Sequence, residues 1–144
     1  MIAVDTNILV HAHRAESHFH HAAQHALRTL AGGDDQWAIA WPCFHEFLNV
    51  VTHRRIFKSP TPLDLALEAV ATWLQTPNLL VLAETEKHWP TLEKLLVSTR
   101  VVGPRVHDAR IAAICLQHGV QEIWSADRDF VAFSPLRAVN PLVS

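Results

Sequence analysis

Short apolar runs separated by longer helical patterns constrain the fold of this chain most strongly. The first run, residues 2–4, begins almost at the first residue, which is typical of a strand buried in a parallel sheet. Further strands are predicted at residues 37–40, 79–82 and 123–125, and a short fifth at 137–139. Because helical segments separate these runs, we predict an α/β fold, a three-layer α/β/α domain around a central, mostly parallel sheet of four to five strands.

Capping residues and chain breakers predict where the helices begin and end. Ser17 can cap a helix that runs to about residue 30, and Gly32-Gly33 can end it. Pro42 suits the first turn of the helix that follows the second strand. The expected helices begin after Asp5, at Ser17, at Pro42 and at Thr61-Pro62, and cover about residues 86–98 and 106–118.

Length and composition are those of a single globular domain. The chain has 144 residues, of which 49% are hydrophobic, so residues 1–144 are expected to share one core. No apolar run approaches the roughly 20 residues that cross a bilayer, and no secretory signal is apparent. Cys43 and Cys115 lie in apolar helical patterns and are expected to be buried thiols. We therefore expect a cytoplasmic protein with no membrane association.

Five acidic residues fall where the predicted elements would bring them to one edge of the sheet. Asp5 directly follows the first strand, and Asp127 and Asp129 follow the fourth. Glu46 and Asp108 lie near the starts of two helices. Ligands of open parallel sheets bind outside the carboxyl ends of the strands, so these acids from four distant segments are expected to meet there.

A divalent cation would offset the repulsion between carboxylates that lie so close together. Carboxylate oxygens without cysteine ligands suit a hard ion, so Mg²⁺ is expected, with Mn²⁺ as an alternative. Such an ion can activate water and stabilise the charge that develops on a phosphodiester during hydrolysis. Thr6, Asn7 and Ser125 lie beside the acids and are expected to orient the carboxylates or a bound water.

Each acid taken singly has an ordinary structural explanation. An Asp after a strand or near a helix start commonly caps a helix or forms a turn. Glu46 and Asp108 would also be stabilised by the helix dipole without any metal. The signal therefore lies in the whole set and in its order along the chain.

Four segments carry this ordered set of acids, and together they resemble the motifs of a known family. They are Ile2-Ala3-Val4-Asp5-Thr6-Asn7, His45-Glu46-Phe47, His107-Asp108-Ala109-Arg110-Ile111-Ala112-Ala113 and Ser125-Ala126-Asp127-Arg128-Asp129-Phe130. The chain is similar over nearly its whole length to the PIN-domain nucleases, and specifically to the VapC toxins of bacterial toxin–antitoxin pairs.

The resemblance implies a PIN-like fold and a metal-dependent endoribonuclease that cleaves structured cellular RNA, often transfer or ribosomal RNA, and so arrests translation. It also implies products with 5′-phosphate and 3′-hydroxyl ends, a homodimer, and a cognate antitoxin that binds across the active site. Asp5, Glu46, Asp108 and Asp127 match the family's main acidic positions, and Asp129 matches a less constant fifth.

These matches assign expected roles to the five acids. Asp5, Asp108 and Asp127 would bind the metal, Glu46 would act as a ligand or general base, and Asp129 would assist. Ser125 stands where the family usually has Thr, so the hydroxyl is retained.

The net charge of −2 does not by itself favour a nucleic-acid partner. If five of the 14 acids share one metal-filled pocket, the remaining nine face 12 lysines and arginines, so the rest of the surface is mildly basic. Arg110 and Arg128 are candidate contacts to RNA or antitoxin, although a solvated helix face also explains Arg110. Other basic residues that can contact an RNA backbone are Arg54, Arg55, Lys58, Arg100 and Arg105.

Other interpretations remain open at this point. The 11 histidines invite a zinc interpretation, but the usual zinc spacings are absent, and neutral histidines at the surface are the simpler explanation. Of these histidines, His45 and His107 each directly precede a predicted metal ligand. An aspartyl phosphatase would resemble Asp-x-Asp at the first strand end, where this chain has Asp5-Thr6-Asn7. A non-catalytic PIN-fold adaptor or RNA-binding module is disfavoured because all the acids are present.

Overall fold

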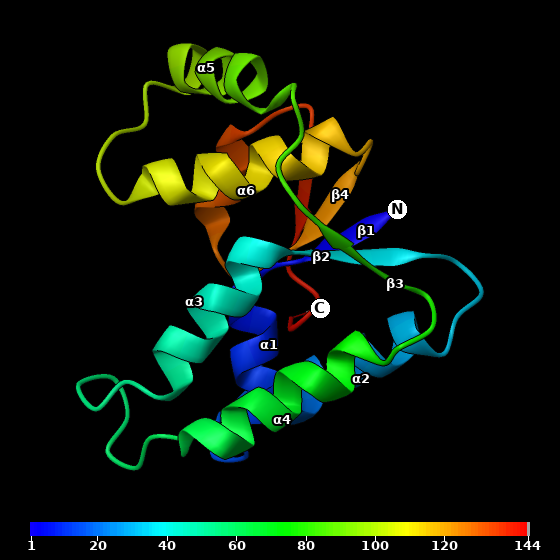
Figure 1. The fold of residues 1–144 in the computed structure, drawn as a ribbon, viewed down its shortest axis with the longest axis vertical. Helices are drawn as coiled ribbons and strands as arrows, with labels where there is room; N and C mark the ends of the chain where they lie inside the picture. Colours follow the sequence, from blue (N-terminus) through cyan, green and yellow to red (C-terminus); the bar gives the residue numbers. More distant parts are fainter. Residues whose placement is uncertain (144) are drawn as a thin grey trace.

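One five-stranded parallel sheet forms the centre of the computed structural model, which describes residues 1–143 (Figure 1). The strand order is β3-β2-β1-β4-β5, so the first strand of the chain lies in the middle of the sheet. The α/β fold with a parallel sheet expected from the sequence is confirmed. The strands are β1 (Ile2–Val4), β2 (Trp37–Ala40), β3 (Leu79–Leu82), β4 (Glu122–Trp124) and β5 (Arg137–Val139).

Helices cover both faces of this sheet. The helices are α1 (Thr6–His13), α2 (His20–Ala31), α3 (Trp41–Val51), α4 (Leu63–Leu74), α5 (His88–Thr99), α6 (Arg105–Gln117) and the 3₁₀ helix η1 (Arg128–Ala132). Helices α5 and α6 pack together on one side of the sheet, and α1 to α4 lie on the other (Figure 1). This arrangement gives the expected three layers.

Helix α6 packs against the sheet and buries several small side chains. All four residues of β2 are buried, as expected for an inner strand covered on both faces. Ala109, Ala112 and Ala113 of α6 are fully buried, and such short side chains let a helix approach a sheet closely. The start of α6, which carries Asp108, is thereby held near the carboxyl ends of the central strands.

The second helix begins later than its capping pattern predicts. It starts at His20, whereas Ser17 was expected to cap it. The Ser17 hydroxyl instead accepts from the backbone N–H of Phe19 at 3.2 Å and pairs with Nδ1 of His11 at 2.6 Å. Ser17 therefore stabilises the turn between α1 and α2, because its side chain is already engaged there.

The state of the two cysteines and the length and apolar character of the helices can be read from the structure. Cys43 and Cys115 are both buried and not disulfide-bonded, as expected. Among the helices of residues 1–143, none has the length and apolar character needed to cross a bilayer.

Candidate active site

Four of the five predicted acids line one small cavity beyond the carboxyl ends of β1 and β4. The cavity has a volume of about 200 Å³. Asp5 reaches it from the N-cap of α1, and the other acids come from α3, α6 and the segment after β4. The lining consists of Asp5, Glu46, Asp108 and Asp127 together with Thr6, Asn7, Val10, His11 and Val50.

Asp5 is the most deeply placed acid, with 5% of its surface exposed. Its Oδ1 accepts the backbone N–H of Thr6 at 2.8 Å, which caps α1. Its Oδ2 accepts from the hydroxyl of Ser125 at 2.8 Å and from Nδ2 of Asn7 at 3.2 Å. The carboxylate is therefore fixed in orientation by donors from both α1 and the end of β4.

Ser125 connects Asp5 to Asp127. Its hydroxyl donates to Asp5 and accepts the backbone N–H of Asp127 at 2.9 Å. Asn7 strengthens the same junction, because its Oδ1 accepts the backbone N–H of Ala126 at 3.0 Å and its Nδ2 donates to Ser125 at 3.1 Å. The expected orienting residues thus form one hydrogen-bonded network between α1 and the loop that carries Asp127.

Glu46 is held by the third orienting residue, Thr6. The Thr6 hydroxyl donates to Oε2 of Glu46 at 2.9 Å, although the two residues are 40 positions apart. Thr6 is buried, whereas Glu46 is exposed on α3. The Glu46 carboxylate therefore lies at the mouth of the cavity in a defined position.

Three carboxylates lie close together, two of them in the lining of this cavity and one beside it. Asp108, Asp127 and Asp129 each offer one oxygen, and these three atoms lie within 4.8 Å of one another. Asp108 lies in the first turn of α6. Asp127 caps η1 by accepting the backbone N–H of Asp129 at 2.9 Å. Asp129 is absent from the lining of the small cavity and lines a larger groove beside it.

Burial and mutual repulsion perturb two of these acids. The pKa of Asp5 rises to about 7, mainly because the side chain is buried and further because Glu46 and Asp108 lie nearby, while the hydrogen bonds from Ser125 and Thr6 act in the opposite direction. The pKa of Asp108 rises to about 6 through burial and through the charges of Asp127 and Glu46. A donor set made only of carboxylate oxygens, with charges that repel one another, fits a hard divalent cation.

A larger groove of about 660 Å³ adjoins the cavity and shares Glu46 and Asp108 with it. The groove is also lined by histidine and arginine side chains, which gives it a more cationic character than the cavity. These additional residues include His45, His107, Arg105 and Arg110. The two spaces therefore meet at Glu46 and Asp108.

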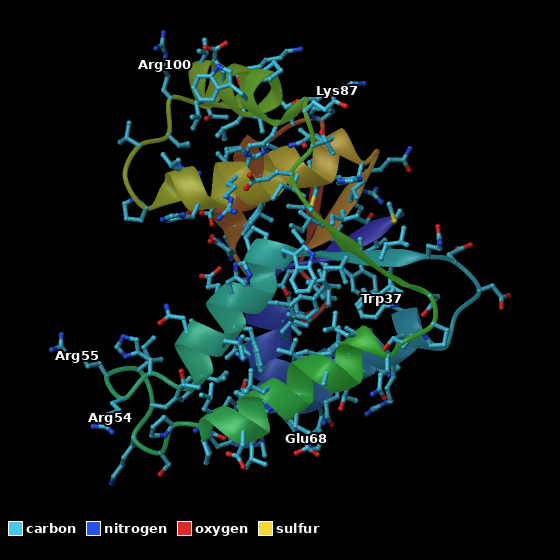
Figure 2. All side chains as sticks on the ribbon, viewed as in Figure 1. Trp37, Arg54, Arg55, Glu68, Lys87 and Arg100 are labelled. Carbon is cyan, nitrogen blue, oxygen red and sulfur yellow. The ribbon has the colours of Figure 1, made fainter. Side chains whose placement is uncertain are left out.

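The candidate RNA-contacting arginines have different surroundings. Arg110 pairs with Glu84 at 2.6 Å while lining the groove, and Arg128 is exposed beside Asp129. Arg54 and Arg55 lie at the tip of the loop after α3 and point away from the body of the protein (Figure 2). Arg110 and Arg128 are thus beside the acids, whereas Arg54 and Arg55 are remote from the centre of the fold.

The surroundings of three histidines and of Cys43 were not predicted from the sequence. His11 lines the small cavity, and His11, His13 and His20 are half-buried and hydrogen-bonded, so the expectation of a histidine surface is wrong for these three. The Cys43 thiol lies 3.9 Å from Oδ1 of Asp5. The four-residue spacing between Asn7 and His11 could have indicated that both share one face of α1.

Comparison with known proteins relates this arrangement to one family. The PIN domain matches residues 2–134. Ribonuclease VapC43 of Mycobacterium tuberculosis is 35% identical over 142 residues, which cover 99% of this chain and 96% of that protein.

Two solved structures share the fold. The crystal structure of VapBC2 from Rickettsia felis, bound to a DNA fragment from their promoter, gives a TM-score of 0.73 at 19% identity and covers 97% of this chain and 98% of that one. Mycobacterium tuberculosis VapC20, described as a sarcin–ricin loop cleaving toxin, gives 0.70 at 20% identity and covers 93% and 95%. The parallel α/β fold of this chain agrees with these matches. The chain therefore belongs to the PIN-domain family, among the VapC ribonucleases.

Proposed function

We propose that this protein is the toxin of a toxin–antitoxin pair and that it cleaves structured RNA, transfer or ribosomal, by Mg²⁺-dependent hydrolysis of a phosphodiester, with Mn²⁺ able to substitute. One observation carries the proposal: acids from four distant segments converge, and three of them offer oxygens within 4.8 Å of one another. The description of VapC20 as cleaving the sarcin–ricin loop favours a structured RNA. Residues 1–144 act as one nuclease domain in this proposal.

The proposed metal ligands are Asp5, Asp108 and Asp127, with Glu46 as a ligand or general base and Asp129 assisting. A bound divalent cation supplies an activated water and neutralises charge on the phosphate. Asp5 cannot rotate freely, because both of its oxygens accept hydrogen bonds, so its ligand geometry is set before an ion arrives.

Glu46 is suited to proton transfer. Its carboxylate is exposed and held by Thr6, and it borders both the small cavity and the groove. In this proposal Glu46 would take the proton of a water that attacks a phosphate at this junction. The arginines of the groove, Arg105 and Arg110, are suited to contact the phosphates on either side, which fixes the position of the RNA without selecting its sequence.

A protein partner is the second part of the proposal. The solved VapBC structures support an antitoxin partner for this chain, and we propose that a cognate antitoxin covers the active site, with Arg110 and Arg128 available to its carboxylates. We also propose a homodimer and a cytoplasmic location, where the RNA targets are. Apolar side chains exposed on α4 are typical of surfaces that contact other proteins. They are Leu63, Leu65, Leu67 and Leu74.

The decisive experiment compares RNA cleavage by the parent protein, Asp127→Asn and Asp34→Asn. Asp34 is exposed in the loop before β2, so its substitution removes the same charge outside the acidic cavity. We expect cleavage in Mg²⁺ and none in EDTA, retained in Asp34→Asn and lost by at least about 100-fold in Asp127→Asn. RNA that is bound but left intact by the parent in every metal would contradict the proposal and support an adaptor.

The RNA target and the partner need separate measurements. Sequencing the RNA ends that appear when the protein is expressed alone identifies the cleaved RNA, and ends with 5′-phosphate and 3′-hydroxyl groups are expected. The gene immediately upstream should encode a small protein with an N-terminal DNA-binding half. Failure of that protein to bind this chain or to suppress cleavage would contradict the toxin assignment and leave the nuclease assignment intact.

A further inference from the structure

Arg105, the first residue of α6, connects the helix that carries Asp108 to the 3₁₀ helix that carries Asp129. Its Nη2 donates to the main-chain oxygen of Asp129 at 3.2 Å. Its Nε lies 3.7 Å from Oδ2 of Asp129, too far for a good hydrogen bond, and is buried with no hydrogen-bond partner among residues 1–143. The guanidinium therefore holds the backbone of Asp129 more firmly than its carboxylate.

The Asp129 carboxylate is accessible, although it lies within ion-pair distance of Arg105. The Asp129 side chain is 57% exposed, and one of its oxygens lies within 4.8 Å of oxygens of Asp108 and Asp127. Asp129 has one internal constraint of its own, the bond from its backbone N–H to Asp127. Arg105 adds a second constraint from a different element, because it lies on α6, 24 positions before Asp129, with β4 and its loops between α6 and η1.

We propose that Arg105 is a positioning residue for the metal site: by holding η1 against α6, it keeps the carboxylate of Asp129 within reach of an ion bound by Asp108 and Asp127. This inference rests on the proposed metal-dependent function. It explains the position of Asp129 by its contact with Arg105, which is not itself a ligand of the metal. Groups that orient a ligating carboxylate commonly change metal affinity about 10-fold to 100-fold when they are removed.

A positioning role and a purely electrostatic role of Arg105 predict opposite changes in metal affinity when its side chain is replaced. Arg105 is a cation beside a cation site, and its charge lowers the pKa of Asp108. Removing that charge alone would make the site more negative and would tighten the binding of a divalent ion. Loss of positioning would weaken binding instead, because Asp129 would no longer be held in place. The two explanations thus predict opposite changes in the same dissociation constant.

The test measures Mn²⁺ binding by electron paramagnetic resonance in the parent protein and in Arg105→Met, Arg105→Lys and Arg128→Met. Arg128 is exposed and precedes Asp129 directly, so Arg128→Met removes an equal charge nearby without removing a contact to Asp129 that the structure records. We expect Arg105→Met to weaken Mn²⁺ binding about tenfold. Arg105→Lys should retain most of the affinity, and Arg128→Met should leave it unchanged or tighter.

A double-mutant cycle identifies the path of the effect. If Arg105 acts through Asp129, Arg105→Met should weaken Mn²⁺ binding no further in an Asp129→Asn background. Thermal unfolding in EDTA checks that each variant is folded. Unchanged or tighter binding in folded Arg105→Met would overturn the inference. A parent protein that binds no Mn²⁺ would instead contradict the metal site of the proposed function.

Discussion

The buried charge of Asp5 should make the metal-free protein less stable as the pH rises. Asp5 is 5% exposed and its pKa lies at about 7, above the ordinary 3.8. The folded protein therefore binds this proton more tightly than the unfolded chain does. The stabilisation is fully present below pH 3.8 and is lost as the pH rises through about 7. At about 1.4 kcal/mol per pH unit, the difference corresponds to about 4 kcal/mol.

Asp5→Asn isolates this contribution. The substitution removes the titrating group, and it leaves one hydrogen bond mismatched, because an amide nitrogen must face either Thr6 N–H or the donors Ser125 and Asn7. That mismatch costs about 1–3 kcal/mol at every pH. We expect Asp5→Asn to be less stable than the parent at pH 4 and more stable at pH 8 when no metal is present.

Urea unfolding in EDTA, followed by tryptophan fluorescence between pH 4 and pH 8, measures the difference. Comparing two variants cancels the contributions of other groups, including His11 and His13, whose lowered pKa values act in the opposite direction. Adding Mn²⁺ at pH 8 should stabilise the parent and leave Asp5→Asn nearly unchanged. Parallel pH profiles for the two proteins would refute the reasoning that burial raises the pKa of Asp5.

Three further outcomes follow from individual contacts. Ser125→Ala removes the donor to Asp5 and the acceptor for Asp127, so RNA cleavage should fall about 10-fold to 100-fold while Ser125→Thr stays active, as measured by initial rates. Thr6→Val keeps the shape but loses the bond to Glu46, so kcat should fall with KM nearly unchanged; an unchanged kcat would exclude a role for this bond. Arg110→Met breaks a half-exposed pair with Glu84, so the free energy of unfolding should change by less than about 1 kcal/mol while KM for RNA rises.

Most of the architecture could be predicted because β1, β2 and β3 are short, continuous apolar runs, and β4 and β5 each have apolar residues after one charged residue. The predicted strands at residues 37–40, 79–82 and 137–139 agree with the observed bounds of β2, β3 and β5. The parallel arrangement follows from the helices between them, since parallel strands need long crossover connections. Helix starts were harder to predict, as Ser17 shows, because a short polar side chain can serve a turn as well as a cap.

The sequence could predict that the acids lie at one edge of the sheet. It could not predict which of them line the small cavity and which line the groove. Strand ends and helix starts indicate a common edge of the sheet, and four of the acids do line one cavity there. That Asp129 lines the neighbouring groove depends on the path of η1, which no periodicity encodes. The contacts of Thr6 with Glu46 and of Arg105 with Asp129 join residues 40 and 24 positions apart, so only the folded chain reveals them.

Crystals of the protein soaked in Mn²⁺ would test the central proposal most directly, because the anomalous signal locates the ion without reference to activity. We predict a peak at about 2.0–2.3 Å from carboxylate oxygens of Asp5, Asp108 and Asp127, with Glu46 or Asp129 nearby, and no such peak in Asp5→Asn crystals grown in the same form. A peak at other residues, or an empty acidic cavity in protein that cleaves RNA in Mn²⁺, would contradict the assignment of these acids as the metal site.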